Sequence, residues 1–455
     1  MNGLSLPAPA ALALAQLEAA GFAAYLVGGC VRDSLRGVPP HDWDLCTAAR
    51  PEQVRAALGA DFSVLDTGLQ HGTVTAVREH VHLEITTFRT EGAYSDGRRP
   101  DGVSFAGRVE DDLSRRDFTV NAMAWSPARG LVDPFGGRDD LEAGLLRCVG
   151  DPDARFTEDA LRIARALRFA SETGFAVEIH TAAAMLRQMG LLDRIARERL
   201  CEELRRTLCG RYVGRVLRAF PDVLAQFCPE LRPMFGFAQH NAHHLYDVWE
   251  HTVRVVEAVP DGVQLRLAAL LHDSGKPASF TMDERGVGHF YGHPKISALL
   301  AHKLLVRLRF DHETRAAVVR LVEYHDRRLD LDPARMRRRL HALGEARVRQ
   351  LLVLKKADCV GRGTHREYIA ELCRAEAMLN DMLAQNQCFS LRQLAVNGRD
   401  MMALGLHGPQ IGDMLHALLA HVLEHPADNQ KERLLALARQ MRDDDEDTGH
   451  ETDLS

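Results

Sequence analysis

Residues 26–33 read LVGGCVRD, and residues 41–45 read HDWDL. In the first stretch a short apolar run ends in Gly28 and Gly29 and leads into a helix-forming segment that carries Arg32, which predicts a strand, a tight turn and a helix. Glycines let the backbone approach a phosphate, free N–H groups at a helix start favour anions, and an arginine can add a bidentate contact. By itself this pattern is equally typical of an ordinary strand–turn–helix.

The second stretch places two carboxylates two residues apart. Alternate side chains of a strand point to the same face, so Asp42 and Asp44 are expected to share one face. Like charges that close are unfavourable unless a cation lies between them, and two-metal phosphoryl transfer holds its ions about 3.5–4 Å apart with such a cluster. Glu84, in the strand-like run VHLEITTF (81–88), is the candidate for a third carboxylate. An isolated D-x-D is more often a solvated strand face, so the surrounding motifs decide.

The chain has 455 residues, more than one ordinary core accommodates, and its pattern changes along its length. Residues 1–150 mix helices with strand-like runs (AAYLVGG, DWDLC, TVTAV, VHLEITTF and GLVDPF), which predicts an α+β head. We expect a helical neck over 151–236, a His-rich helical domain over 237–360 and a helical tail over 361–442.

Charge and cysteine usage limit the classes of protein. The segment 443–455 carries seven acidic residues and no Lys or Arg, which predicts a disordered C-terminus. Without this segment the net charge of the chain changes from −6 to +1, so the net charge neither supports nor excludes RNA binding. Nine cysteines without a C-x-x-C pair are typical of reduced thiols in a cytoplasmic protein. No run of about 18 apolar residues occurs, so we expect no membrane span.

Taken together, the motifs resemble the polymerase-β-like tRNA nucleotidyltransferases, in particular the bacterial CCA-adding enzymes and their poly(A) polymerase relatives. The matches lie in family order: LVGGCVRD, DWDL, the loop RTEGAYSDGRRPDGVSF (89–105), RRDFTVNAMA (115–124), DPFGGRDDL (133–141), EDALRIARALRF (158–169) and ERLCEEL (198–204). The resemblance implies a polymerase-β-like head that extends tRNA 3′ ends from ATP and CTP. It also implies that Asp42 and Asp44 hold Mg²⁺, with Glu84 completing the acidic set.

The same resemblance implies the nucleotide contacts. Gly28, Gly29 and Arg32 would bind the triphosphate, and Arg116, Asp117 and Asn121 would contact the phosphates and the ribose. Arg162, Arg165 and Arg168 are spaced to line one helix face, where arginines can follow phosphates.

Asp159 and Arg162 would read the base. They are three residues apart and are expected to be neighbours on a helix face. Cytosine and adenine both present an amino donor beside a ring-nitrogen acceptor, which an Asp acceptor beside an Arg donor fits, whereas uracil and guanine present the reverse order. Outside this context, E-D-x-x-R is typical of an ordinary helix start.

The His-rich block resembles the HD phosphohydrolase superfamily of helical metal-binding domains. His251, His272, Asp273 and Asp358 match its core ligands, and His293 and His325 match the additional histidines of two-metal members. Imidazole and carboxylate together suit a transition metal such as Ni²⁺ or Mn²⁺ rather than Mg²⁺. The alternative is a domain retained for structure or for docking RNA.

Two other functions stay open on the sequence. One is a poly(A) polymerase, or an enzyme that adds only A or only CC, built on the same head; the loop 89–105 argues against CC-only addition, because the resemblance implies that this loop is needed to add A. The other is a phosphohydrolase acting on 2′,3′-cyclic or 3′-phosphate RNA ends, with the head as an RNA-binding remnant. The intact Asp42, Asp44 and Asp117 argue against a remnant.

Overall fold

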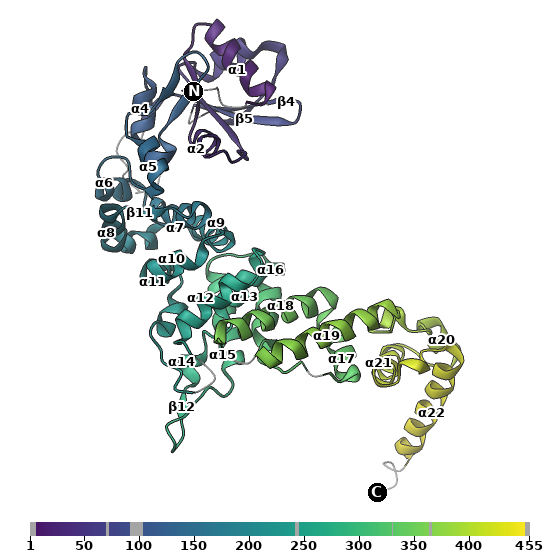
Figure 1. Ribbon diagram of the computed structural model, residues 1–455. Coiled ribbons are helices and arrows are strands. Elements are labelled where there is room, and N and C mark those ends of the chain that lie inside the picture. Colours follow the sequence, from purple (N-terminus) through teal and green to yellow (C-terminus); the bar gives the residue numbers. More distant parts are fainter. Residues whose placement is uncertain are drawn as a thin grey trace. The chain divides into compact units, whose positions relative to one another are not determined.

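The computed structural model describes residues 6–69, 72–91, 103–241, 245–329, 331–363 and 366–450. These residues form two compact units (Figure 1). Unit 1 comprises Met1–Arg232 with Leu304–Phe310, and unit 2 comprises Pro233–Lys303 with Asp311–Ser455. Residues 92–102, the centre of the loop predicted to be needed for adding A, lie outside the described residues.

The head of unit 1 is built on a seven-stranded sheet with the order β3-β4-β5-β2-β1-β8-β9. Its strands are β1 (Ala24–Val27), β2 (Trp43–Thr47), β3 (Ser63–Gly68), β4 (Thr73–Arg78), β5 (Val81–Thr87), β8 (Ala124–Ser126) and β9 (Gly130–Val132). β2 and β5 pair in parallel, and the other neighbours pair antiparallel. Each of the five predicted strand-like runs overlaps one of these strands, and β3 and β8 lie outside those runs.

Both faces of the central strands are buried, as their alternating side chains require. Leu26 and Leu45 pack with helices α1 (Ala8–Ala19) and α3 (Pro51–Leu58) on one face. Tyr25, Val27 and Cys46 pack with α4 (Val109–Ser114) on the other. The central strand β1 is therefore covered on both faces, whereas β5 alternates buried and exposed side chains and leaves Glu84 exposed.

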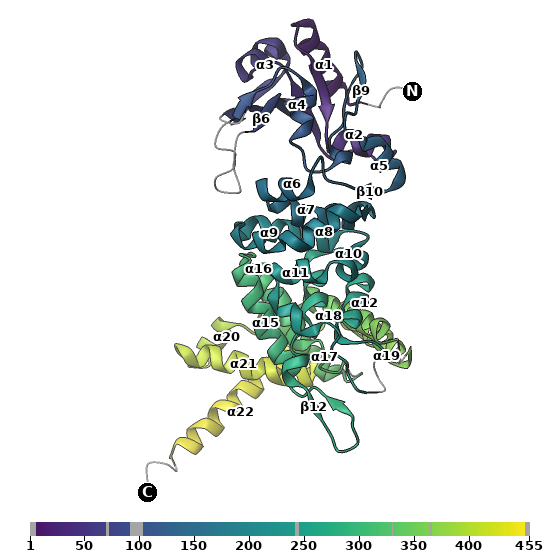
Figure 2. The ribbon, with the colours of Figure 1, turned by 90° about the vertical axis from the view of Figure 1, so that its left-hand side faces the viewer.

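Helices complete unit 1. The short α2 (Gly29–Leu35) and α5 (Gly137–Ala143) belong to the head, and the neck consists of α6 (Pro152–Glu158), α7 (Leu161–Thr173), α8 (Ile179–Gln188), α9 (Arg197–Cys209), α10 (Val213–Ala219) and α11 (Pro221–Phe227). α7 packs along α9 and against α10 (Figure 2). Three small two-stranded pairings join β6 (Arg89–Glu91) to β7 (Val103–Phe105), β10 (Leu145–Leu146) to β11 (Ala176–Val177), and, in unit 2, β12 (Thr281–Met282) to β13 (Gly288–His289).

Unit 2 is otherwise helical. Its elements are α12 (Val248–Ala258), α13 (Val263–Leu271), α14 (Lys276–Ser279), α15 (His293–Arg307), α16 (His312–Tyr324), α17 (Pro333–Leu343), α18 (Glu345–Arg362), α19 (Arg366–Ala384), α20 (Gly398–Ala403), α21 (Pro409–Glu424) and α22 (Lys431–His450). The last four residues of α15 belong to unit 1. α12, α13, α16 and α18 pack on one another, and a separate apolar cluster joins α20, α21 and α22.

The predicted fold class, an α+β head followed by mostly helical parts, is confirmed. The helix α22 runs to His450 and therefore extends into the segment predicted to be disordered from residue 443. The five-part division of the chain stays a prediction.

Candidate active site

One pocket of about 870 Å³ in unit 1 gathers every site residue predicted for the head and neck. Its lining includes Gly28, Gly29, Arg32, Asp42, Asp44, Glu84, Arg116, Asp117, Asn121, Asp159, Arg162, Arg165 and Arg168. These residues come from β1–α2, β2 and the residue before it, β5, the segment after α4, the junction of α6 and α7, and α7. Segments more than 100 residues apart in sequence therefore supply one polar cavity.

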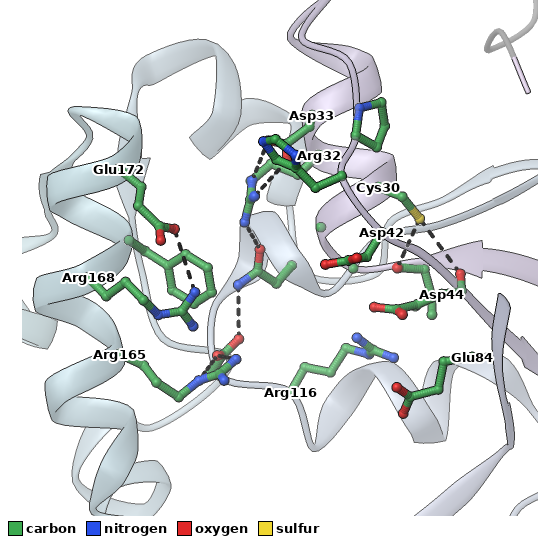
Figure 3. A pocket seen from close by; sticks show the side chains of 18 of the residues that line it. Cys30, Arg32, Asp33, Asp42, Asp44, Glu84, Arg116, Arg165, Arg168 and Glu172 are labelled. Carbon is green, nitrogen blue, oxygen red and sulfur yellow. Dashed lines mark hydrogen bonds and ion pairs between the residues drawn. The ribbon is translucent and has the colours of Figure 1, made fainter. Parts of the chain in front are cut away.

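The three carboxylates meet because β2 and β5 pair in parallel. Asp44 is directly opposite Glu84 in the register, and Asp42 lies one residue before β2 begins. Burial, followed by the charge of Glu84, raises the pKa of Asp44 to about 6. Figure 3 shows the three side chains on one side of the pocket, with the Arg116 guanidinium facing them. Such an all-oxygen donor set, destabilised by its own negative charge, fits a hard divalent cation such as Mg²⁺.

The glycine turn brings the backbone at Gly28 close to Arg116 in the pocket. Gly28 has φ of 77°, in the left-handed region that favours glycine. A Cβ at this position would lie 3.0 Å from Nη1 of Arg116, so a larger residue would press on that guanidinium. The sequence pattern therefore predicted this turn correctly, and its close approach is to Arg116.

A chain of hydrogen bonds orients the predicted phosphate and ribose contacts. Arg32 donates from Nη1 to Asn121 Oδ1 (2.7 Å), and Asn121 donates from Nδ2 to Asp117 Oδ1 (3.1 Å). Arg165 donates from Nε (2.8 Å) and Nη2 (2.5 Å) to Asp117 Oδ2. Burial is the largest single influence and raises the pKa of Asp117, but Arg165, Asn121 and Arg162 together outweigh burial and lower it. Asp117 is thus a buried anion that holds the Arg165 guanidinium directly and the Arg32 guanidinium through Asn121.

Phe169 is a pocket residue to which the sequence analysis assigned no role. Its ring centroid lies 4.0 Å from the Arg168 guanidinium and 5.3 Å from those of both Arg32 and Arg165. Three like charges can share this space because each also has an acidic partner: Asp33, Asp117 and Glu203, respectively, for Arg32, Arg165 and Arg168. The motif RALRF contained Phe169, but spacing alone does not reveal which cations surround a ring.

The predicted base-reading pair differs from expectation. Asp159 and Arg162 do not share a helix face, because α6 ends at Glu158, α7 begins at Leu161, and Asp159 between them is extended (φ −138°, ψ 101°). The Asp159 carboxylate accepts a hydrogen bond from the Leu161 N–H (3.0 Å) and so breaks the helix at this point. Arg162 instead donates to Glu158 Oε2 and to the carbonyl of Arg115, each at 2.8 Å.

The six predicted ligands of the His-rich block also converge, within unit 2. Asp273 is central: its Oδ2 lies 3.2 Å from His272 Nε2 and 3.4 Å from His251 Nε2, and its Oδ1 lies 3.3 Å from His293 Nε2 and 3.6 Å from His325 Nε2. Asp358 lies 3.2 Å from His251 and is also paired with Arg362. All six side chains are buried. Within the described ranges, His251–His272–Asp273 and Asp273–His293–His325 have ligand atoms close enough to share an ion.

The histidine tautomers fit a cation. Nδ1 of His272, His293 and His325 lies 2.8, 2.9 and 2.6 Å, respectively, from a backbone carbonyl three residues earlier. A carbonyl only accepts, so each Nδ1 carries a proton and Nε2 is the ring nitrogen that faces inward. His293 Nε2 and His325 Nε2 are 3.2 Å apart, where two lone pairs need a proton or a metal ion between them. The donor set of nitrogen and carboxylate fits a transition metal.

Comparison with known proteins agrees with this geometry. A family model described as "Poly A polymerase head domain" matches residues 24–147, one described as "Probable RNA and SrmB- binding site of polymerase A" matches 174–233, and an HD domain matches 241–363. Fold and site together define a nucleotidyltransferase-type head joined to an HD domain.

Full-length relatives narrow the class. The CCA-adding enzyme of Enterococcus faecalis is 32% identical over 439 residues, 95% of this chain and 96% of the relative. The CCA-adding enzyme of Limosilactobacillus fermentum is 45% identical over 232 residues, and this match covers 50% of this chain and 57% of the relative's length. The crystal structure of the Bacillus stearothermophilus CCA-adding enzyme in complex with CTP superposes with a TM-score of 0.73 at 28% identity, covering 97% of this chain and 100% of that one. The chain belongs to the CCA-adding enzyme family.

Proposed function

We propose that this protein adds C, C and A to the 3′ ends of tRNA, using CTP and ATP and releasing pyrophosphate. The observation that carries the proposal is the single pocket lined by three carboxylates, a glycine turn and a group of guanidiniums. Family membership supports tRNA as the acceptor and CTP and ATP as donors. The described residues contain no helix with the length and apolar character to cross a membrane. All nine cysteines are free thiols, which supports a cytoplasmic location.

In the proposed reaction, the 3′-hydroxyl oxygen of the RNA attacks the α-phosphorus of the nucleotide, and the bond to pyrophosphate breaks. Asp42, Asp44 and Glu84 would hold Mg²⁺, which lowers the pKa of the hydroxyl and neutralises charge on the triphosphate. Gly28, Gly29, Arg32 and Arg116 would bind the triphosphate. Asp117 and Asn121 would position the ribose, while Arg165 and Arg168, each held by an acid, would offer guanidinium N–H donors to the pocket.

The test is to incubate the protein and Mg²⁺ with tRNA that lacks CCA and all four nucleoside triphosphates, and to sequence the products. Discrete CCA ends are expected. Long A tails would instead mean a poly(A) polymerase. No product from tRNA lacking CCA, together with a single added A in a parallel reaction with tRNA that already ends in CC, would mean an A-only enzyme.

Base choice gives a second measurement. We expect Asp159→Ala and Arg162→Ala to relax discrimination against UTP and GTP rather than only to slow the reaction, since each lost polar contact removes a penalty of about 1–3 kcal/mol against a wrong base. The ratio of kcat/KM for CTP to that for UTP measures this directly. Variants that are slower but equally selective would place base selection elsewhere.

The His-rich cluster supports a second activity, metal-dependent hydrolysis of phosphate esters at RNA ends. The observation that favours it is the inward convergence of Nε2 atoms on Asp273. His251, His272, Asp273, His293, His325 and Asp358 would hold Ni²⁺, Mn²⁺ or a similar ion.

A further inference from the structure

A fully buried carboxylate lies behind the two arginines that follow α4. Asp112 belongs to α4, and its side chain has no exposed surface. Its Oδ1 accepts hydrogen bonds from Nε (3.0 Å) and Nη2 (2.7 Å) of Arg115, and its Oδ2 accepts one from Nη2 of Arg116 (3.3 Å). Both arginines line the pocket, whereas Asp112 does not. Asp112 can therefore affect the pocket only through the groups that it holds.

Asp112 is an anion in the folded protein. Burial is the largest influence and raises its pKa, but the charges of Arg116 and Arg115 and the hydrogen bonds to the carboxylate together outweigh burial and lower it. A buried carboxylate of this kind is matched by its guanidinium partners, and removing its charge would leave those guanidiniums without their anion.

The guanidinium of Arg116 also faces a second set of anions. Figure 3 shows it directed toward Asp44 and Glu84. Burial and the charge of Glu84 raise the pKa of Asp44, and the charge of Arg116 lowers it, so Arg116 and Asp44 interact across the pocket. Among the described residues, however, Asp112 is the one carboxylate at ion-pair distance from Arg116, and the buried Nε of Arg116 has no hydrogen-bond partner there. Arg116 therefore has a donor to spare for the carboxylates that it faces.

We propose that Asp112 is a positioning residue of the active site, which tethers Arg116 away from the carboxylates that would bind Mg²⁺. Without the tether, the guanidinium would pair with Asp44 and Glu84, because two neighbouring carboxylates attract a nearby cation. In that place it would compete with a divalent ion for the same oxygens and would be withdrawn from the triphosphate. This inference rests on the proposed addition of nucleotides with Mg²⁺ in the head.

Direct binding of Mn²⁺, followed by electron paramagnetic resonance without nucleotide or RNA, tests the tether. The His-rich cluster would also bind Mn²⁺, so the head site is measured as the share of binding that Asp44→Ala removes. Asp112→Asn should weaken this share about tenfold, because an amide offers one acceptor oxygen to two guanidiniums and a hydrogen bond to a charged group contributes on that scale.

Asp111→Asn is the matched control for this measurement. It removes the same charge one residue earlier on α4. Within the part of the chain that the structure describes, Asp111 neither lines the pocket nor forms an ion pair with Arg115 or Arg116. The affinity of the head for Mn²⁺ should therefore stay at the wild-type value.

An Arg116→Met background separates a tether from a general loss of negative charge. Arg116→Met itself should bind Mn²⁺ in the head at least as tightly as the wild type, since the competing cation is gone. In this background Asp112→Asn should change the Mn²⁺ affinity by less than about twofold, because nothing is left to be tethered. Weakening by the same factor in both backgrounds, or no weakening by Asp112→Asn alone, would overturn the proposal.

Nucleotide addition gives an independent measurement. Asp112→Asn should raise the Mg²⁺ concentration for half-maximal addition of C about tenfold, and excess Mg²⁺ should restore most of kcat. A purely structural role would lower kcat at every Mg²⁺ concentration, and that result would also overturn the proposal. If Asp112→Asn melts well below the wild type, Asp112→Ser, which leaves room for water beside Arg115, decides by the same Mn²⁺ affinity. Mn²⁺ binding that Asp44→Ala leaves unchanged would refute the metal site of the proposed function itself, before Asp112 is substituted.

Discussion

Asp42→Ala and Asp44→Ala should each abolish nucleotide addition while leaving the fold intact. Asp44 lies opposite Glu84 in the parallel register, and Asp42 immediately precedes the same strand, so each substitution removes one oxygen donor from a three-carboxylate set. Loss of a metal ligand at a phosphoryl-transfer site removes several kcal/mol of stabilisation of developing charge, on the order of 10³-fold in rate. Single-turnover addition of C to tRNA lacking CCA, at saturating CTP and Mg²⁺, measures the loss.

The controls for this prediction come from the same sheet. Asp66 lies on β3, is exposed and pairs with Arg55 outside the pocket, so Asp66→Ala should keep wild-type turnover. Asp44→Asn should be as inactive as Asp44→Ala, yet in the presence of chelator it should melt no lower than the wild type, because it removes the repulsion between Asp44 and Glu84. Turnover above a few per cent of the wild-type value in both alanine variants would exclude this site.

The sequence predicted the parts of the head site that depend on local pattern. The left-handed turn at Gly28 and the position of Asp44 on a strand follow from residues within a few positions of each other. The opposition of Asp44 and Glu84 does not, since it depends on which strands pair and in what register, and β2 pairs with β5 rather than with the strand that follows it. The strand-like run VHLEITTF made Glu84 a candidate, and the resemblance to a family assigned it to the acidic set; the spacing of the residues did not.

Asp159 shows why a helical pattern misleads. E-D-x-x-R with apolar residues at helical spacing predicts one continuous helix, but an Asp side chain can bond to a nearby backbone N–H in place of the helical carbonyl. Here it does so at Leu161, and the chain bends between α6 and α7. That bend separates Asp159 from Arg162 and turns it toward Arg199, a partner that no local periodicity could identify.

The ligand residues of the His-rich cluster could be predicted together, because the resemblance depends on their residue types and their order along the chain. Their geometry could not, because it depends on how the helices pack. His251 lies on α12, His272 and Asp273 follow α13, and Asp358 lies on α18, three helices that pack on one another. The sequence did not predict that Arg362 would pair with both oxygens of Asp358 (3.0 and 2.5 Å). Both carboxylate oxygens of Asp358, a predicted metal ligand, therefore already accept hydrogen bonds from Arg362.

The purified protein should carry a transition metal in unit 2, and changing His272 and Asp273 together to alanine should remove it. The double substitution deletes the residue on which four imidazoles converge and one of those imidazoles, so neither ligand group remains complete. Elemental analysis after purification without chelators should find Ni, Mn, Fe, Co or Zn at up to one or two equivalents in the wild type and only background in the variant. Uptake of Mn²⁺ or Ni²⁺ by the stripped protein should release protons, because a metal ion replaces the proton between inward-facing Nε2 atoms.

Addition of C and A with Mg²⁺ should survive nearly unchanged in the double variant, since the carboxylates of the head belong to unit 1. Any hydrolysis of a phosphomonoester or a 2′,3′-cyclic nucleotide should disappear. His421→Ala is the control: this histidine pairs with Asp428 in the tail and belongs to neither ligand group, so metal content should not change. A wild-type protein that neither retains a metal nor takes up added Mn²⁺ or Ni²⁺ would show that the cluster is structural and that protons alone hold its histidines together.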